Sequence, residues 1–186
     1  MTTVANVSTG KPGVSGGVYV ADSGTTLPTS VTASLSDFTS LGYVSEDGLT
    51  NSNSPESDTG KAWGGDIVIT YQTEKPDTFQ FTLIEAKNVD VLEVVYGEDN
   101  VSGALSTGVA VQANSDEAVE HAWVFDMIMR NNTYKRICVP AGKVIEVGDI
   151  VYKDDELVGY DLTIQAFPDS NGNTHYEYIK EVPASS

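Results

Sequence analysis

Polar and apolar residues alternate with a period of two in several short stretches of this chain, which is typical of β-strands. The pattern is clearest in Asp66–Gln72 (DIVITYQ) and Phe79–Ile84 (FQFTLI), and the turn-forming residues Glu74–Asp77 between them predict a hairpin. Further strands are predicted at residues 14–21, 41–44, 108–112, 118–129, 133–139, 144–152, 157–167 and 175–179, with turns at Asn131-Asn132, Ala141-Gly142 and Asp154-Asp155.

One segment has helical spacing instead. In residues 88–96 the apolar side chains of Val89, Leu92 and Val95 recur three residues apart, Asn88 can cap the first turn, and Gly97 ends the helix. Antiparallel strands joined by short turns, together with a single helix, predict a mainly β fold. We expect a β-sandwich or partly closed barrel with one appended α-helix.

The stretch from residue 42 to 66, GYVSEDGLTNSNSPESDTGKAWGGD, is polar, rich in turn formers and too long for an ordinary hairpin loop. Its flanks predict the two legs of a long protruding β-hairpin, with the polar residues and turn formers near the tip. With about eight residues in each leg, the hairpin would reach about 25 Å. A free ribbon of this kind is marginally stable, so we expect another copy of the protein to cover it. A mobile surface loop or an active-site lid is the alternative.

A length of 186 residues favours a single domain. We expect one domain over residues 1–186, with residues 45–66 as the extended hairpin arm and residues 1–13 and 182–186 as flexible termini. No stretch approaches the ~20 apolar residues that span a bilayer, and the N-terminus does not have the pattern of a signal sequence. We therefore expect synthesis in the cytoplasm and no membrane partner.

The charge of the chain is strongly unbalanced. It has 27 acidic and 10 basic residues, a formal net charge of −17, and residues 88–129 contain eight acids and no Lys or Arg. Such a surface repels nucleic acid, anionic membranes and copies of itself. A basic footprint for double-stranded DNA is missing, so tight DNA binding is not expected.

Two motifs suggest catalytic or metal chemistry at first sight. Residues 13–17 (GVSGG) match the G-x-S-x-G pattern around Ser15, but the preceding strand and following helix that such a nucleophile needs are not predicted. His121 and His175 each lack a second His or Cys at ligand spacing, which argues against zinc.

Two further candidates are weaker still. Residues 169–173 (DSNGN) resemble a calcium loop, but the glycine comes at the fourth position instead of the sixth, which favours a hairpin turn. Cys138 lies in an apolar run and is expected to be a buried hydrophobic residue. We therefore predict no enzyme activity, no catalytic residues, no metal site and no cofactor.

Three stretches carry a family resemblance: KPGVSGGVYVA, FTSLGYVSEDGLTNS and KAWGGDIVITYQTEKPDTFQFTLIEAKNVDVLEVVYG, which follow one another in this order. With the order of strand, long hairpin, strand pair, helix and further strands, the chain resembles the tail tube (major tail) proteins of long-tailed bacteriophages with non-contractile tails. The similarity extends over roughly residues 10–180. The ordered combination carries the resemblance, since no single motif is diagnostic.

The resemblance implies a structural virion protein whose β-sandwich subunits form hexameric rings. The rings stack into a tube through which a tape-measure protein and then DNA pass, and tail terminator and distal tail proteins are further partners. It makes residues 46–66 the leading inter-subunit element, with the strand at 14–21 as a second. The candidate contact residues from these segments are Glu46, Asp47, Leu49, Asp58, Lys61, Trp63, Val18 and Tyr19.

Trp63 is the expected apolar anchor, because buried aromatic side chains dominate interface energies. The alternative is that Trp63 packs at the base of the hairpin inside its own subunit.

The charge agrees with a conduit for DNA. A lumen with a net acidic face would repel phosphate over about 10 Å at ordinary ionic strength, and we expect part of the acidic excess to face the channel. Repulsion between subunits predicts that added salt favours assembly. Two other classes of function stay open: a β-sandwich binding module, carbohydrate-binding or adhesin-like, and a hydrolase.

Overall fold

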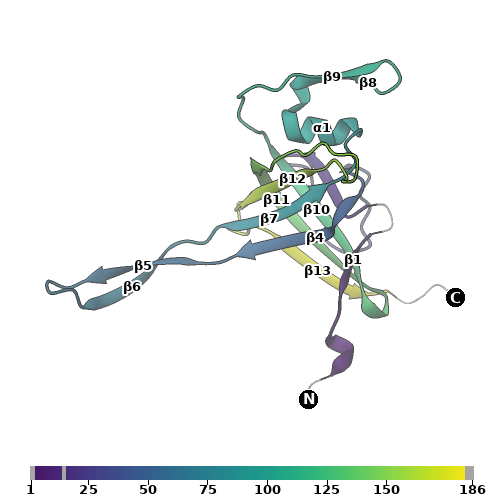
Figure 1. The fold of residues 1–186 in the computed structure, drawn as a ribbon. Coiled ribbons are helices and arrows are strands. Elements are labelled where there is room, and N and C mark those ends of the chain that lie inside the picture. Colours follow the sequence, from purple (N-terminus) through teal and green to yellow (C-terminus); the bar gives the residue numbers. More distant parts are fainter. Residues whose placement is uncertain (1–2, 14–15, 183–186) are drawn as a thin grey trace.

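The computed structural model describes residues 3–13 and 16–182 (Figure 1). These residues form a mainly β fold with one α-helix, α1 (Val89–Tyr96), and short 3₁₀ turns at Val4–Asn6, Glu98–Asn100 and Arg130–Asn132. The strands are β1 (Gly10–Pro12), β2 (Val18–Asp22), β3 (Thr39–Ser40), β4 (Val44–Asn53), β5 (Glu56–Lys61), β6 (Ile67–Glu74), β7 (Asp77–Leu83), β8 (Val101–Ala104), β9 (Gly108–Val111), β10 (Glu120–Met129), β11 (Thr133–Val147), β12 (Tyr160–Phe167) and β13 (Tyr176–Glu181).

The body is one large antiparallel sheet in the order β3-β2-β10-β11-β12-β7-β4, with β1 added to β10 and β13 added to β11. The sheet curls around its core without closing, because β4 is hydrogen-bonded to β7 and has no ladder partner on its other side among the described strands. The mainly β fold with one helix and a long protruding hairpin is therefore confirmed, as a partly closed sheet.

Strand β10 contributes side chains to a hydrophobic cluster on each face of the sheet. Trp123 and Phe125 point to the inner face, where they join the main core with Phe79, Phe81 and side chains from β2, β11, β12 and α1. Ala122 and Val124 point to the outer face, where Phe38 and Cys138 complete a second, smaller cluster. Successive residues of a strand face opposite sides, so one strand supplies both clusters.

The helix prediction is confirmed together with its ends. Asn88 caps α1 by accepting a hydrogen bond from the backbone N–H of Asp90 at 3.1 Å, and Gly97 follows it with a φ of 93°. A positive φ favours glycine, which accounts for the end of the helix at this residue. Val91 and Leu92 are buried against the core, so α1 covers one end of the curled sheet (Figure 1).

The turn predicted at Ala141-Gly142 is wrong, since β11 runs without a break from Thr133 to Val147. The ladder with β10 shifts register in this region, and β11 changes its other neighbour from β13 to β12. Pro140 cannot donate a ladder hydrogen bond, and a Cβ on Gly142 would lie 2.8 Å from Trp123 Cδ1. The turn-forming residues therefore lie where one long strand shifts register and changes its neighbour, instead of separating two strands.

The hairpin turn predicted at Glu74–Asp77 is also wrong. β6 pairs with β5 and β7 pairs with β4, so β6 and β7 run in the same direction on one leg of a longer hairpin. This leg starts at Ile67 and carries the chain back into the body at Asp77. The expected turn is instead a short interruption between β6 and β7.

Both ends of the chain differ in part from the flexible termini expected at 1–13 and 182–186. Residues 10–12 form β1 and pair with Met127–Met129 of β10, and the Val182 N–H donates to Asn132 O at 3.0 Å. Residues 1–2 and 183–186 lie outside the described residues.

Candidate interaction surface

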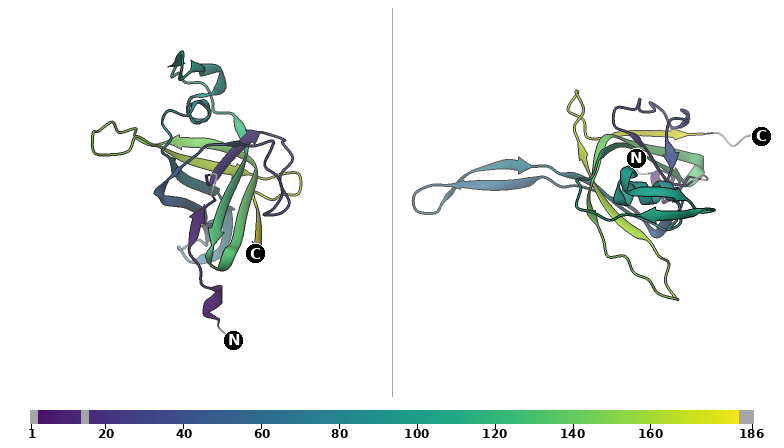
Figure 2. Two further views of the ribbon diagram at one scale, coloured as in Figure 1. Left: turned by 90° about the vertical axis from the view of Figure 1, so that its right-hand side faces the viewer. Right: turned by 90° about the horizontal axis from the view of Figure 1, so that it is seen from above.

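A two-stranded arm, residues 56–74, projects from the body (Figures 1 and 2). Its strands β5 and β6 pair from Glu56↔Glu74 to Lys61↔Ile67, and the turn at the tip is closed by a hydrogen bond from Ala62 N to Asp66 O. Gly64 and Gly65 adopt positive φ angles of 124° and 101° at this turn. The tip therefore lies at residues 62–66, beyond the polar residues around Pro55 where we expected it.

One face of the arm carries apolar side chains that the described part of the chain leaves exposed. Ile67, Ile69 and Tyr71 alternate along β6 and are 62%, 57% and 48% exposed. Ile69 lies over Gly60 on the opposite strand, where a Cβ would come within 2.6 Å of its Cγ2. Burying an exposed Ile or aromatic side chain contributes about 1.5–3 kcal/mol, so this face is a strong candidate for contact with another molecule.

Trp63 occupies the tip of the arm and is fully exposed. This placement differs from the alternative in which it packs at the base of the hairpin within its own subunit. Asp58 and Lys61 also lie on the arm, at exposed positions of β5, with Asp58 opposite Tyr71. Three of the candidate contact residues are thus gathered on the projecting element.

The root of the arm contains a buried carboxylate. Asp77, the first residue of β7, is 1% exposed and accepts hydrogen bonds from Asn51 Nδ2 at 2.8 Å and Thr174 Oγ1 at 2.5 Å. Its Oδ2 also lies 2.5 Å from His175 Nδ1. Burial raises the pKa of Asp77, but the hydrogen bonds from Thr174, Asn51 and His175 and the charge of His175 outweigh it, so the pKa is lowered below its ordinary value.

Glu46, Asp47 and Leu49 lie near the other end of the hairpin, in β4. Between Val44 and Leu49 the strand bulges away from β7, and Gly48 adopts a φ of 73°. The bulge lines a cavity of about 400 Å³ in the gap that separates β4 from β1. Leu49 is half-buried and packs against the main core, while Glu46 and Asp47 border the cavity together with Lys11 and Asp126.

The two candidates from β2 have different surroundings. Val18 is 2% exposed and belongs to the main core, so its side chain has no surface to offer a neighbouring subunit. Tyr19 is half-buried and packs against the outer cluster. The expectation of an inter-subunit contact through β2 therefore does not extend to the side chain of Val18.

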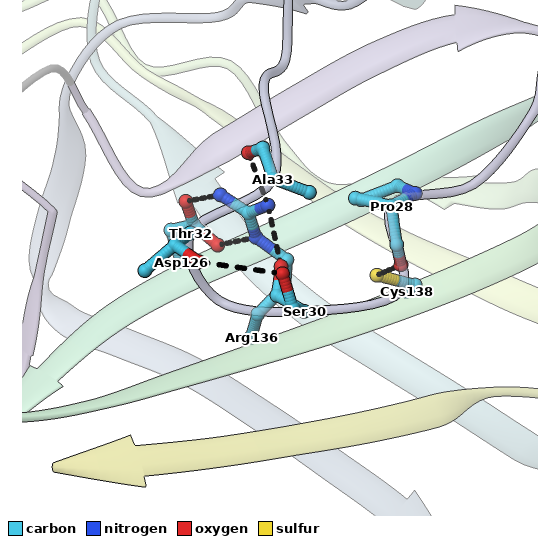
Figure 3. Close-up of polar contacts among 7 residues, drawn as sticks. All are labelled: Pro28, Ser30, Thr32, Ala33, Asp126, Arg136 and Cys138. Atoms are coloured by element: carbon cyan, nitrogen blue, oxygen red, sulfur yellow. Dashed lines mark hydrogen bonds and ion pairs between the residues drawn. The ribbon is translucent and has the colours of Figure 1, made fainter.

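The outer face of the sheet is covered by residues 23–38, which an ion pair fixes in place (Figure 3). The Arg136 guanidinium donates to both carboxylate oxygens of Asp126 at 2.6 Å and to the carbonyl oxygens of Ser30 and Ala33. Next to it, the Cys138 thiol donates to Pro28 O, and burial raises its pKa to about 12. These contacts make the cover part of the folded body, in contrast to the projecting arm.

The residues considered for catalysis or metal binding are not gathered into one site. Ser15 lies outside the described residues, His175 contacts Asp77, and His121 lies in β10 beside Trp123. Within residues 3–13 and 16–182, no group of three or more His, Cys, Asp or Glu side chains is placed to hold a metal ion. Asp169 accepts from the backbone N–H groups of Asn171 and Asn173, as a turn residue does.

The arm's apolar face was missed by the sequence reasoning, which assigned Ile67, Ile69 and Tyr71 to a strand of the body. Their alternation predicts a strand but does not reveal which molecule covers its apolar side. The contact of Asp77 with His175 joins residues 98 positions apart and has no local signal. Pro55 and Pro76, which lie within two residues of the paired Asn53 and Asp77, were the available clue to the extent of the arm.

No helix in the described part of the chain is long and apolar enough to cross a membrane. No curated protein matches the sequence. A family model described as phage tail tube protein matches residues 6–186. Since this match extends over nearly the whole chain and the fold is the mainly β fold expected for such a protein, the chain belongs to the phage tail tube protein family and is a structural protein of the phage tail.

Proposed function

We propose that this subunit assembles into hexameric rings that stack into the tail tube, with the arm as the main contact between subunits. The observation that carries the proposal is the exposed apolar face of the arm, formed by Ile67, Ile69 and Tyr71. A ribbon of two strands that is exposed on both faces gains little stability alone. Burial of this face against another copy of the chain supplies the stabilisation that the isolated subunit lacks.

The other contact candidates have secondary roles in this proposal. Trp63 at the tip is an exposed aromatic anchor, and Asp58 and Lys61, paired with Tyr71 and Ile67, place opposite charges beside the apolar face. Glu46 and Asp47 border the gap between β4 and β1, where a neighbouring chain can approach the unpaired edge of β4. Exposed strand edges are ready sites for such pairing.

The assembled tube is a conduit that DNA traverses without being held. Neutralising several phosphates with basic side chains would create affinity that resists passage. The formal net charge of −17 works against such contacts, and part of the acidic excess faces the lumen. The tube encloses the tape-measure protein before DNA passes, and tail terminator and distal tail proteins are its other partners. The subunit is synthesised and assembled in the host cytoplasm.

Removal of the arm tests this function directly. Residues 54–76 are replaced by an Asn-Gly turn that joins Asn53 to Asp77, which are already paired. Circular dichroism and Trp123 fluorescence establish that the body folds. We expect monomers of the shortened chain under conditions in which the full chain forms rings or tubes, measured by light scattering and negative-stain electron microscopy. Tubes from the shortened chain in normal yield would refute the proposal.

A pair of point variants tests the face of the arm. Ile69→Asp places a charge on the apolar face, and Thr70→Asp places the same charge on the opposite face of the same strand. We expect Ile69→Asp to reduce the yield of tubes at least tenfold and Thr70→Asp to reduce it by less than threefold. Equal losses in the two variants would exclude the apolar face as the contact.

The charge argument has its own test. Subunits with a net charge of −17 repel one another, and salt screens this repulsion. Light scattering across a salt series is expected to rise with added salt, and a fall would contradict the argument. Salt-sensitive, tight binding of DNA to the assembled tube would contradict the acidic lumen.

A further inference from the structure

Both legs of the arm are interrupted at the same level, where the arm leaves the body. The last pair of the body ladder is Asn53↔Asp77, and the first pair of the arm ladder is Glu56↔Glu74. Two residues of each leg lie between these pairs, Ser54-Pro55 on one and Lys75-Pro76 on the other, and none of the four takes part in a described ladder pair. Figure 1 shows both legs as plain chain between the arrows of the body and those of the arm.

The chemistry of proline explains why the ladder stops here on both legs. Pro55 and Pro76 have no backbone N–H, so neither can donate a hydrogen bond across the ribbon. A proline also disfavours helical conformations of the residue before it, which keeps Ser54 and Lys75 extended. The result is a pair of extended tethers without cross-strand bonds, in which bending is taken up by the ψ angles and by the residues around the prolines.

The body side of this break is held firmly. Asp77 is anchored by hydrogen bonds to Asn51 of β4 and Thr174 in the segment before β13, and its carboxylate contacts His175. The His175 ring in turn packs edge-on against Phe79, with ring centroids 5.5 Å apart. Two separate parts of the chain therefore fix the point at which β7 enters the body.

Among the residues that the structure describes, the arm side is held by its own β5–β6 ladder. All eight residues of β6 are exposed, and the half-buried residues of β5 include Gly60, which is covered by Ile69 of the arm itself. Immediately below the break, the buried Asn53 Oδ1 has no hydrogen-bond partner among the described residues. A buried acceptor without a partner is unfavourable, so this position of the legs leaves one polar atom at the root unsatisfied.

We propose that the proline-containing breaks in the two legs form a hinge, about which the arm swings with its β5–β6 ladder paired while Asp77 and its partners hold the body side still. Eight residues of β6 span about 26 Å, so a rotation of about 10° at the root moves the tip by about 4–5 Å. The hinge is a property of the free subunit. It goes beyond the proposed function, because it does not depend on what the arm contacts.

Distances between spin labels test the hinge in the full-length monomeric subunit. One label pair joins body and arm, Lys180→Cys with Thr70→Cys, and a second lies within the arm, Lys61→Cys with Glu74→Cys; all four positions are exposed. Cys138 is buried and does not compete for the label. We expect the distance distribution of the body–arm pair to be at least twice as wide as that of the pair within the arm. Equal widths would overturn the hinge.

A stiffened variant gives an independent measurement. Pro55→Thr with Pro76→Thr restores both N–H donors, so the ladder can continue through the break. We expect the body–arm distribution to narrow to the width of the pair within the arm, whereas Pro168→Thr, a change at an exposed proline after β12, leaves it unchanged. An unchanged width in the double variant would also overturn the hinge, and the comparison of the two label pairs decides the matter if that variant does not fold.

Discussion

The buried carboxylate at the root of the arm is the most informative residue to change. Asp77→Asn keeps the shape of the side chain but removes the charge that Asn51, Thr174 and His175 stabilise at distances of 2.5–2.8 Å. Hydrogen bonds to charged groups contribute about 1.5–3 kcal/mol each, and a buried group left without its partner costs about 1–3 kcal/mol. Asparagine retains one acceptor oxygen, so we expect the free energy of unfolding to fall by about 3 kcal/mol.

The measurement is urea unfolding of the monomer at pH 7, followed by the fluorescence of the buried Trp123 in a Trp63→Phe background. The loss corresponds to a fall in Tm of about 6–12 °C for a chain of this size. Asp58→Asn is the matched control, since it makes the same chemical change at an exposed position of the arm. We expect it to change the stability by less than about 0.5 kcal/mol.

The effect of Asp77→Asn on stability should also depend on pH. The folded state lowers the pKa of Asp77 below the ordinary value of 3.8. Its contribution is therefore complete above that value and is lost as the pH falls through the lower folded pKa. The stability gap between the parent protein and Asp77→Asn should shrink below about pH 4. A gap as small as that of Asp58→Asn, or one equally large at pH 7 and pH 2.5, would refute the reasoning.

Three further predictions concern the body. Arg136→Lys cannot reproduce the paired bonds to Asp126 together with the two carbonyl contacts, so we expect a loss of about 2–3 kcal/mol in urea unfolding. Cys138 has its pKa raised to about 12, so its thiol should react with a thiol reagent at pH 8 at least a hundred times more slowly in the native protein than in urea. A rapid reaction in the native protein would contradict the burial of this thiol. Arg136→Lys should accelerate the reaction of Cys138 in the native protein. Gly142→Ala places a Cβ 2.8 Å from Trp123 Cδ1 and should cost about 1–3 kcal/mol with a red shift of Trp123 emission; an unchanged spectrum and Tm would count against the close contact.

Local patterns in the sequence were sufficient for the elements whose partners lie nearby in the chain. The cap at Asn88 and the glycine at position 97 set the ends of α1. The two asparagines at 131 and 132, both with positive φ, connect β10 to β11 where a turn was expected. These features depend on backbone preferences of single residues, which act in the unfolded chain as well as in the folded one.

The extent of the arm could not be decided in this way. Ile67, Ile69 and Tyr71 alternate with polar residues as in a strand that packs on its own core, and a period of two looks the same whichever molecule covers the apolar side. The predicted arm at 45–66 accordingly stopped short of β6, and the expected turn at residues 74–77 proved to be a break in one leg. Proline residues were visible in both legs, but only the ladders on either side of them show that the two interruptions lie at the same level of the ribbon.

Composition, periodicity and residue order are properties of the chain, so they were enough to predict the mainly β character, the single helix, the acidic charge and the resemblance to tail tube proteins. Which strands are neighbours, where β11 exchanges β13 for β12, and how Asp77 meets His175 across 98 residues became visible only in the folded protein. Such contacts depend on side chains brought together from distant segments. Packing selects among strand pairings that local preferences leave nearly equal in free energy.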